Sequence, residues 1–197
     1  MGLLDSFERG LERAVGGAFA KTFKSGVQPL EISAALRREL DTKAAVVSRD
    51  RILVPNELHV ALSPADHARM EALGESLIDE LTQLLQQHAT AQRYVFPGGV
   101  RITLSADAAL AEGVVVVSSR SRTVIGRGSD ADITLDDTGT SRKHLEILWD
   151  GERAQVTDLG STNGTRLNGE PVTRAVLPPD SVIELGRTRI LFRVLAQ

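Results

Sequence analysis

Arginine, serine and threonine residues gather in three short, turn-rich segments of the C-terminal half of this sequence. The segments are Ile125–Ile133, Thr140–His144 and Asp158–Thr165. Guanidinium and hydroxyl groups are the donors that a phosphate monoester prefers, because charge-assisted hydrogen bonds match its oxygens and its charge of about −1.5 to −2. The residue types therefore indicate a site for a phosphorylated ligand.

Short strands must position these three segments. Gly, Asp, Asn or Pro separates apolar or β-branched runs throughout this half, and this spacing predicts an antiparallel β-sandwich with the polar segments in its loops. Loops on a rigid scaffold often carry binding residues. Trp149 is expected in the core. The predicted strands are Val114–Val117, Thr123–Ile125, Ile133–Leu135, His144–Trp149, Ala154–Asp158, Thr165–Leu167, Val182–Leu185 and Arg189–Val194.

Each segment has an ordinary structural interpretation when taken alone. Gly126-Arg127-Gly128 is typical of a turn beside a solvated arginine, and Asn163-Gly164 favours a hairpin turn. The pair Asp136-Asp137 is predicted to be solvated surface. The order and spacing of the three segments together carry the functional prediction.

That order resembles the forkhead-associated (FHA) domain family over residues 113–197. The resemblance is carried by Gly126-Arg127, Ser141-Arg142-Lys143-His144 and Ser161-Thr162-Asn163-Gly164-Thr165, with Gly186 and the strand through Phe192 resembling the end of the domain. It implies a β-sandwich that binds phosphothreonine in a partner protein, has no catalytic activity and needs no cofactor.

The resemblance also implies residue roles. Arg127 is similar to the arginine that contacts a phosphate oxygen, Ser141 to the hydroxyl donor and Arg142 to a second cation. Thr162 resembles the residue that seats the phosphate and the threonine methyl group, and Asn163 the residue that holds the peptide backbone.

Gly126, His144 and Gly164 are expected to support the site rather than to bind. His144 is accordingly not assigned as a base. Lys143 either faces solvent or contacts the peptide, and the sequence leaves this open.

The N-terminal half follows a helical period with a few short strands. Residues 1–105 are therefore predicted to form an α+β domain whose helices cover one face of an antiparallel sheet. The predicted elements are a helix over Leu3–Phe23 that is kinked or divided at Gly16-Gly17, a helix from Pro29 to Leu40, strands Ile52–Val54 and Leu58–Leu62, a long helix from Ser63-Pro64 to Leu85, and a hairpin of Tyr94–Phe96 with Val100–Leu104.

This half also resembles a known family. Gly2-Leu3-Leu4, Gln28-Pro29-Leu30-Glu31-Ile32 and Val54-Pro55-Asn56-Glu57-Leu58 are similar to FhaA-type proteins of actinobacteria. The expected organisation is an N-terminal domain over 1–105, a short linker over 106–112 and an FHA domain over 113–197. FhaA-type proteins often carry a long linker rich in Pro and Gln here, and this sequence departs from that pattern.

The FhaA-type resemblance implies a phosphothreonine-dependent adaptor downstream of Ser/Thr protein kinases, with a role in regulating bacterial cell-wall (peptidoglycan) synthesis. The implied partner is a phosphorylated, membrane-associated protein such as a pseudokinase or a lipid flippase. The expected location is the cytoplasm, with recruitment to the membrane by that partner.

Composition argues against other classes of protein. The net charge is −3 and the pI about 5.8, without the basic surface that nucleic-acid binding requires, so no nucleic-acid partner is expected. The sequence has no cysteine, which excludes thiolate metal sites. It has no apolar run near the ~20 residues that span a bilayer and no layout typical of a signal peptide, so direct membrane insertion is not expected.

The sequence also bears on three alternative functions. An enzyme is disfavoured because the four histidines form no metal-binding pair and no phosphate-binding loop of the nucleotide-hydrolase type occurs. A degenerate FHA site is disfavoured because all five expected binding residues are present. A scaffold whose N-terminal domain mediates phosphorylation-independent assembly remains the alternative function.

Overall fold

The computed structural model describes residues 26–48 and 51–194, which divide into two compact units. The first contains residues 26–42, 57–94 and 100–119 of the described chain, and the second contains 43–48, 51–56, 95–99 and 120–194. The predicted helix over Leu3–Phe23 lies outside the described residues. The domain boundaries drawn from the sequence stay a prediction.

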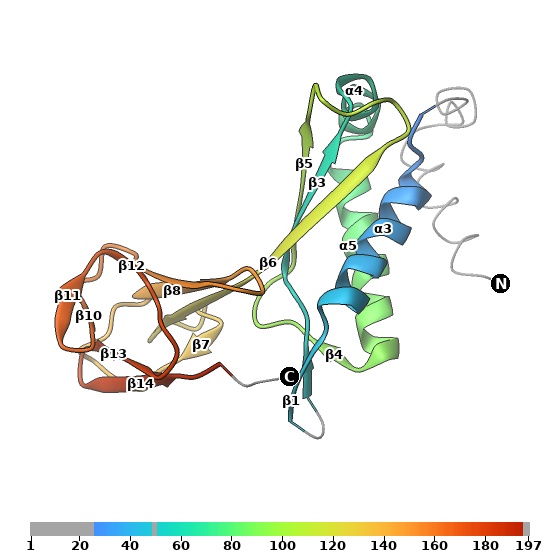
Figure 1. The fold of residues 1–197 in the computed structure, drawn as a ribbon. Helices are drawn as coiled ribbons and strands as arrows, with labels where there is room; N and C mark the ends of the chain where they lie inside the picture. Colours follow the sequence, from blue (N-terminus) through green and yellow to red (C-terminus); the bar gives the residue numbers. More distant parts are fainter. Residues whose placement is uncertain (1–25, 49–50, 195–197) are drawn as a thin grey trace. The chain divides into compact units, whose positions relative to one another are not determined.

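The first unit has three labelled helices and the strand pair β3 and β5 (Figure 1). Helix α3 is Pro29–Lys43, α4 is Pro64–Glu71 and α5 is Glu75–Gln92, while β3 is Glu57–Leu62 and β5 is Arg101–Ala106. The apolar residues of these helices and strands are buried, and the predicted mixture of helices and strands is confirmed. The fully buried ones include Ile32, Leu36, Leu40, Leu58, Val60, Leu62, Leu77, Leu81 and Leu85.

The long helix predicted from Ser63 to Leu85 is two helices in the structure. Its start is as expected, since Ser63 is the N-cap and its hydroxyl accepts a hydrogen bond from the Asp66 N–H at 3.2 Å. The break falls between Glu71 and Glu75, where Gly74 adopts φ 64°, in the left-handed region that interrupts a helix. The prediction of one continuous helix was wrong at this point.

The predicted hairpin of Tyr94–Phe96 with Val100–Leu104 was also wrong. Strand β4, Tyr94–Val95, lies beside β2, Arg51–Leu53, and β5 pairs in parallel with β3 from Glu57↔Arg101 to Leu62↔Ala106. The two helices between β3 and β5 form a crossover that returns the chain in the same direction, which a parallel pair requires. Strand β1, Ala45–Ser48, was not predicted and pairs with β2 antiparallel.

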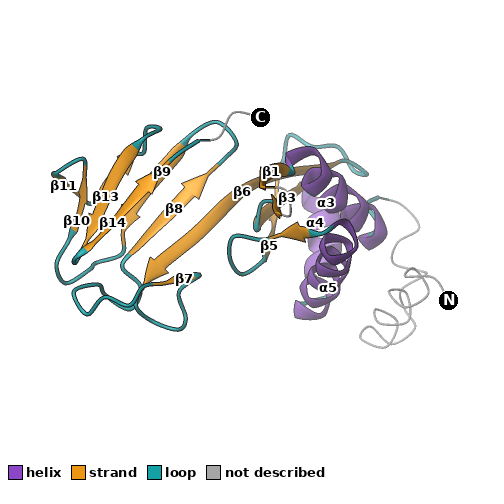
Figure 2. Ribbon diagram, turned by 90° about the horizontal axis from the view of Figure 1, so that it is seen from below, coloured by secondary structure: helices purple, strands orange, loops and turns teal. Residues whose placement is uncertain are grey.

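The second unit is a β-sandwich, as predicted (Figure 2). The longest segment of this unit begins within β6, Val115–Gly126, between Ser119 and Arg120. The sequence predicted two strands here, but the polar residues Ser118–Arg122 continue the extended chain. One sheet contains this part of β6 with β7 (Ile133–Thr134), β8 (Leu145–Trp149), β9 (Ala154–Asp158) and β12 (Arg174–Val176).

The other sheet has the order β11-β10-β13-β14. Its strands are Glu170–Val172 (β11), Thr165–Leu167 (β10), Ser181–Leu185 (β13) and Thr188–Phe192 (β14). Strands β11 and β12 were missed, because each is only three residues long and they are separated by a single residue. The core between the sheets includes Ile125, Leu145, Val156, Ile183 and Leu185, and Trp149 packs against it as expected.

Within the described part of the chain, none of the helices is both long and apolar enough to cross a bilayer.

Candidate functional site

Strand pairing brings the three polar segments to one end of the sandwich. Ile125 near the end of β6 pairs with Leu145 at the start of β8, and Leu145 pairs with Asp158 at the end of β9. The loops that follow β6, precede β8 and follow β9 therefore leave the sheet together. The sequence placed these segments in loops, and the register explains why the loops meet.

Ser141 links the loop before β8 to the loop after β9. Its hydroxyl oxygen accepts a hydrogen bond from the Thr162 N–H at 3.0 Å and lies 3.4 Å from the Thr162 hydroxyl. On its other side, the Ser141 carbonyl accepts a hydrogen bond from the Arg127 N–H at 3.0 Å. Residues from all three segments thus converge on one serine.

Gly126 and Gly128 allow this close approach of backbones. The Gly128 N–H donates to the Arg142 carbonyl at 3.0 Å. A Cβ atom on Gly126 would overlap that same carbonyl, so only glycine fits there.

His144 is fully buried and joins two of the loops. Its Nδ1 accepts a hydrogen bond from the Ser141 N–H at 3.1 Å, and its Nε2 lies 3.1 Å from the Gly164 carbonyl. Because a carbonyl only accepts, this pair of bonds fits the neutral ring with its proton on Nε2. Both ring nitrogens of His144 are occupied by hydrogen bonds to the loops, as expected for a structural histidine and not for a base.

The cationic side chains differ in how they are engaged. Arg127 and Arg142 are exposed, and the Arg127 guanidinium has no hydrogen-bond or ion-pair partner among the described residues. Lys143 instead pairs with Asp130 at 3.1 Å. The hydrogen bond from Lys143 lowers the pKa of Asp130. Lys143 is therefore turned toward an acid of its own domain, while Arg127 remains available to an anion.

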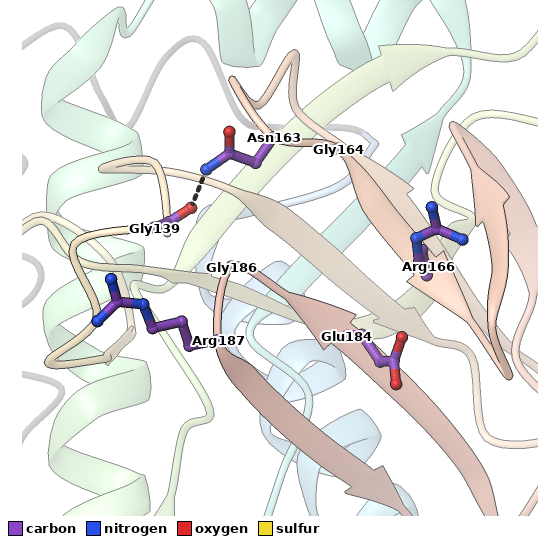
Figure 3. Close-up of a pocket in the computed structure, with 7 residues that line it drawn as sticks. All are labelled: Gly139, Asn163, Gly164, Arg166, Glu184, Gly186 and Arg187. Atoms are coloured by element: carbon purple, nitrogen blue, oxygen red, sulfur yellow. Dashed lines mark hydrogen bonds between the residues drawn. The ribbon is translucent and has the colours of Figure 1, made fainter.

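Asn163 lies at the rim of the same loops. Its side-chain N–H donates to the Gly139 carbonyl at 2.8 Å (Figure 3). This bond connects the loop after β9 to the loop before β8 a second time, beside the Ser141–Thr162 contact.

Sequence reasoning missed two aspartates that organise these loops. Asp158 accepts hydrogen bonds from the Gly160 and Ser161 N–H groups and from the Ser161 and Thr165 hydroxyls, the last two at 2.6 Å. Burial raises its pKa, but hydrogen bonds from Ser161, Thr165 and Gly160 outweigh burial and leave the pKa below its usual value.

Asp137 was predicted to be solvated, and this was wrong. It is only 9% exposed and accepts hydrogen bonds from the Gly139 N–H at 2.8 Å, the Arg187 N–H at 2.7 Å and the Thr188 hydroxyl at 2.8 Å. The Thr188 hydrogen bond, foremost among these, lowers the pKa of Asp137 to about 2. Both aspartates precede a glycine by two residues, a spacing typical of Asp-initiated turns that could have revealed them.

Replacing Asp158 by alanine is expected to destabilise the second unit by about 2–3 kcal/mol, because two hydroxyl and two N–H donors lose their acceptor. Urea unfolding followed by the fluorescence of Trp149, the single tryptophan, measures this. The exposed Asp136→Ala is the control and should change stability by no more than about 0.5 kcal/mol. Equal midpoints for Asp158→Ala and the wild type would contradict the assigned role.

The described residues contain no group of three His, Cys, Asp or Glu side chains arranged to hold a metal ion.

Comparison with known proteins agrees with this architecture. The family described as "FhaA, N-terminal domain" matches residues 4–118, and the FHA domain family matches residues 123–186. The chain is 52% identical over 71 residues to the FHA domain-containing protein FhaA of Mycobacterium tuberculosis, which covers 36% of this chain and 14% of that protein.

It is also 46% identical over 70 residues to the glycogen accumulation regulator GarA of Mycolicibacterium smegmatis, covering 36% of this chain and 44% of GarA. The aligned segment thus spans less than half of either relative. Among solved structures, the FhaA FHA domain complexed with the intracellular domain of Rv3910 is 47% identical, with a TM-score of 0.36, and the match covers 40% of this chain and 87% of that one. Since the first family match extends over more than half of the residues and the second covers the sandwich loops, the chain belongs to the FhaA N-terminal domain family and carries an FHA domain.

Proposed function

We propose that this protein is a phosphothreonine-dependent adaptor, with residues 113–197 binding a phosphorylated threonine in a partner protein. The main observation behind this proposal is that three loops converge on Ser141. One of them carries Arg127, whose guanidinium is not engaged by any residue that the structure describes. Guanidinium and hydroxyl donors on converging loops suit a phosphate monoester. FHA-domain membership supports the same class of ligand.

The proposed site consists of Arg127, Ser141, Arg142, Thr162 and Asn163. Arg127 and Arg142 supply charge, and the Ser141 hydroxyl, held by Thr162, donates to a phosphate oxygen. Asn163 holds the peptide backbone at the rim. Gly126, His144 and Gly164 keep the loops in place, through the close backbone approach at Gly126 and the two hydrogen bonds of His144.

The proposal extends to the biological role with support from family membership alone. The protein acts downstream of Ser/Thr protein kinases in the regulation of bacterial cell-wall synthesis. Its partner is a phosphorylated, membrane-associated protein of the pseudokinase or flippase type, and the protein itself is cytoplasmic and recruited by that partner.

Titration calorimetry of the full chain with a phosphothreonine peptide pool tests the binding function. Micromolar affinity is expected for phosphothreonine, with a loss of at least roughly tenfold for the unmodified peptides, because these lack the anion that the arginines contact. Phosphoserine peptides should bind more weakly because they lack the methyl group. Comparable affinity for modified and unmodified threonine would overturn the proposal and favour a phosphorylation-independent scaffold.

A further inference from the structure

A hollow of about 400 Å³ lies directly beside the proposed phosphate site. Asn163 and Gly164, which belong to the loop after β9, form part of its wall (Figure 3). The hollow therefore shares Asn163 with the proposed phosphopeptide site.

Three glycines, Gly139, Gly164 and Gly186, line the hollow. Gly139 and Gly186 lie against each other, and a Cβ atom on Gly186 would stand 2.6 Å from the carbonyl carbon of Gly139. Gly164 has open space where its Cβ would point and adopts φ 75°. A ligand can approach the backbone here without meeting side chains.

The charged groups in the wall leave an excess of positive charge. The Arg187 guanidinium has no hydrogen-bond or ion-pair partner among the described residues, although its N–H is fixed by Asp137 at 2.7 Å. Glu184 is engaged by Arg189, whose Nε lies 3.0 Å from its carboxylate.

Arg166 adds a second cation to this wall. It pairs in register with Glu184, and its Nη1 donates to the Gly169 carbonyl at 2.9 Å, which leaves its other donors available. In Figure 3 the side chains of Arg166 and Glu184 lie on one side of Gly186 and that of Arg187 lies on the other.

On the basis of the phosphothreonine binding proposed above, we propose that this hollow selects phosphopeptides that carry an aspartate or glutamate near the phosphothreonine, and that Arg187 recognises that carboxylate. A guanidinium binds a carboxylate through two parallel hydrogen bonds, and Arg187 is the lining residue with all of its side-chain donors free. Asp137 already holds the backbone of Arg187, so binding has to order only the Arg187 side chain and loses less conformational entropy.

A position scan of one phosphothreonine peptide tests this inference, with Asp, Ala or Lys placed in turn at each flanking position. Affinities are measured by fluorescence polarisation on the full chain. The wild type should bind the best Asp peptide about tenfold more tightly than the matching Lys peptide, as expected for one charge-assisted contact. Arg187→Glu should reverse that preference and still bind the Lys peptide.

Arg193→Glu is the matched control, because it makes the same charge change at an exposed arginine that lies just after β14 and outside the hollow. It should retain the wild-type preference. Phosphothreonine binding without any preference for Asp, or an unchanged preference in Arg187→Glu, would overturn the selection by Arg187 while leaving the phosphothreonine function intact. Failure of the wild type to bind every phosphothreonine peptide would overturn the function itself, and the selection with it.

Discussion

Replacing Arg127 by alanine is expected to weaken phosphothreonine-peptide binding roughly 10- to 150-fold, the equivalent of one or more hydrogen bonds to a charged group at about 1.5–3 kcal/mol. The Arg127 residue is exposed, and its guanidinium has no partner among the described residues, so its removal breaks no hydrogen bond or ion pair within that part of the chain. The backbone bond from the Arg127 N–H to Ser141 remains in the variant. The loss should therefore appear in affinity and not in stability.

Two further variants sharpen this test. Arg127→Lys keeps the charge but not the forked geometry, and its affinity should fall between wild type and Arg127→Ala. Arg153→Ala removes an exposed arginine beside the β8–β9 turn, where Trp149 pairs with Ala154 at the end of the strands away from the proposed site. It should bind like the wild type. Unchanged affinity in Arg127→Ala, with calorimetry showing full binding, would remove Arg127 from the site.

Local sequence patterns predicted the sandwich well because its strands are short and bounded by strong turn residues. Strands Ala154–Asp158 and Thr165–Leu167 begin and end where the sequence placed them. The Asn-Gly turns and the glycine pair around Arg127 depend on backbone preferences that neighbouring residues reveal. For the same reason the loops carrying the proposed site could be located before their geometry was known.

Features that depend on residues far apart in the sequence could not be predicted from such local patterns. The parallel pairing of β5 with β3 joins residues on either side of two helices, and no local period distinguishes it from a hairpin. Asp137 is buried because its partners Arg187 and Thr188 lie about fifty residues further along the chain. An aspartate in an Asp-Asp pair appears solvated until that distant hairpin is placed against it.

Among the substitutions considered, replacing Asp66 in the first unit is expected to reduce stability the most. Its carboxylate is fully buried and accepts hydrogen bonds from the Val27 N–H at 2.8 Å, the Ser63 hydroxyl at 2.7 Å and the Gly113 N–H at 2.9 Å, and it pairs with Arg69. One side chain thus joins the segment before α3, the start of α4 and the segment before β6.

Asp66→Ala should lower the free energy of unfolding by about 3–5 kcal/mol, because it leaves the buried donors without their acceptor. It also removes the buried partner of Arg69, which keeps only the exposed Glu112 at 3.6 Å. Such a loss of stability is a large share of the roughly 5–15 kcal/mol that stabilises a typical domain. Urea unfolding followed by circular dichroism at the helix band measures it, since α3, α4 and α5 belong to this unit. The exposed Asp79→Ala on α5 is the control and should cost no more than about 0.5 kcal/mol.

The pH dependence of stability provides an independent test of Asp66. Burial raises its pKa, but hydrogen bonds from Ser63, Gly113, Val27 and Arg69 outweigh burial and bring the pKa from the ordinary 3.8 to about 2. A pKa that is lower in the folded state stabilises the protein above the unfolded value, and that stability is lost as pH falls through the folded value. By linkage the contribution is about 2 kcal/mol, complete above pH 4 to 5 and lost as the pH falls toward 2. Asp66→Ala should therefore flatten the stability profile between about pH 4 and 2, whereas a profile with the wild-type slope would show that another carboxylate carries the acid sensitivity of this unit.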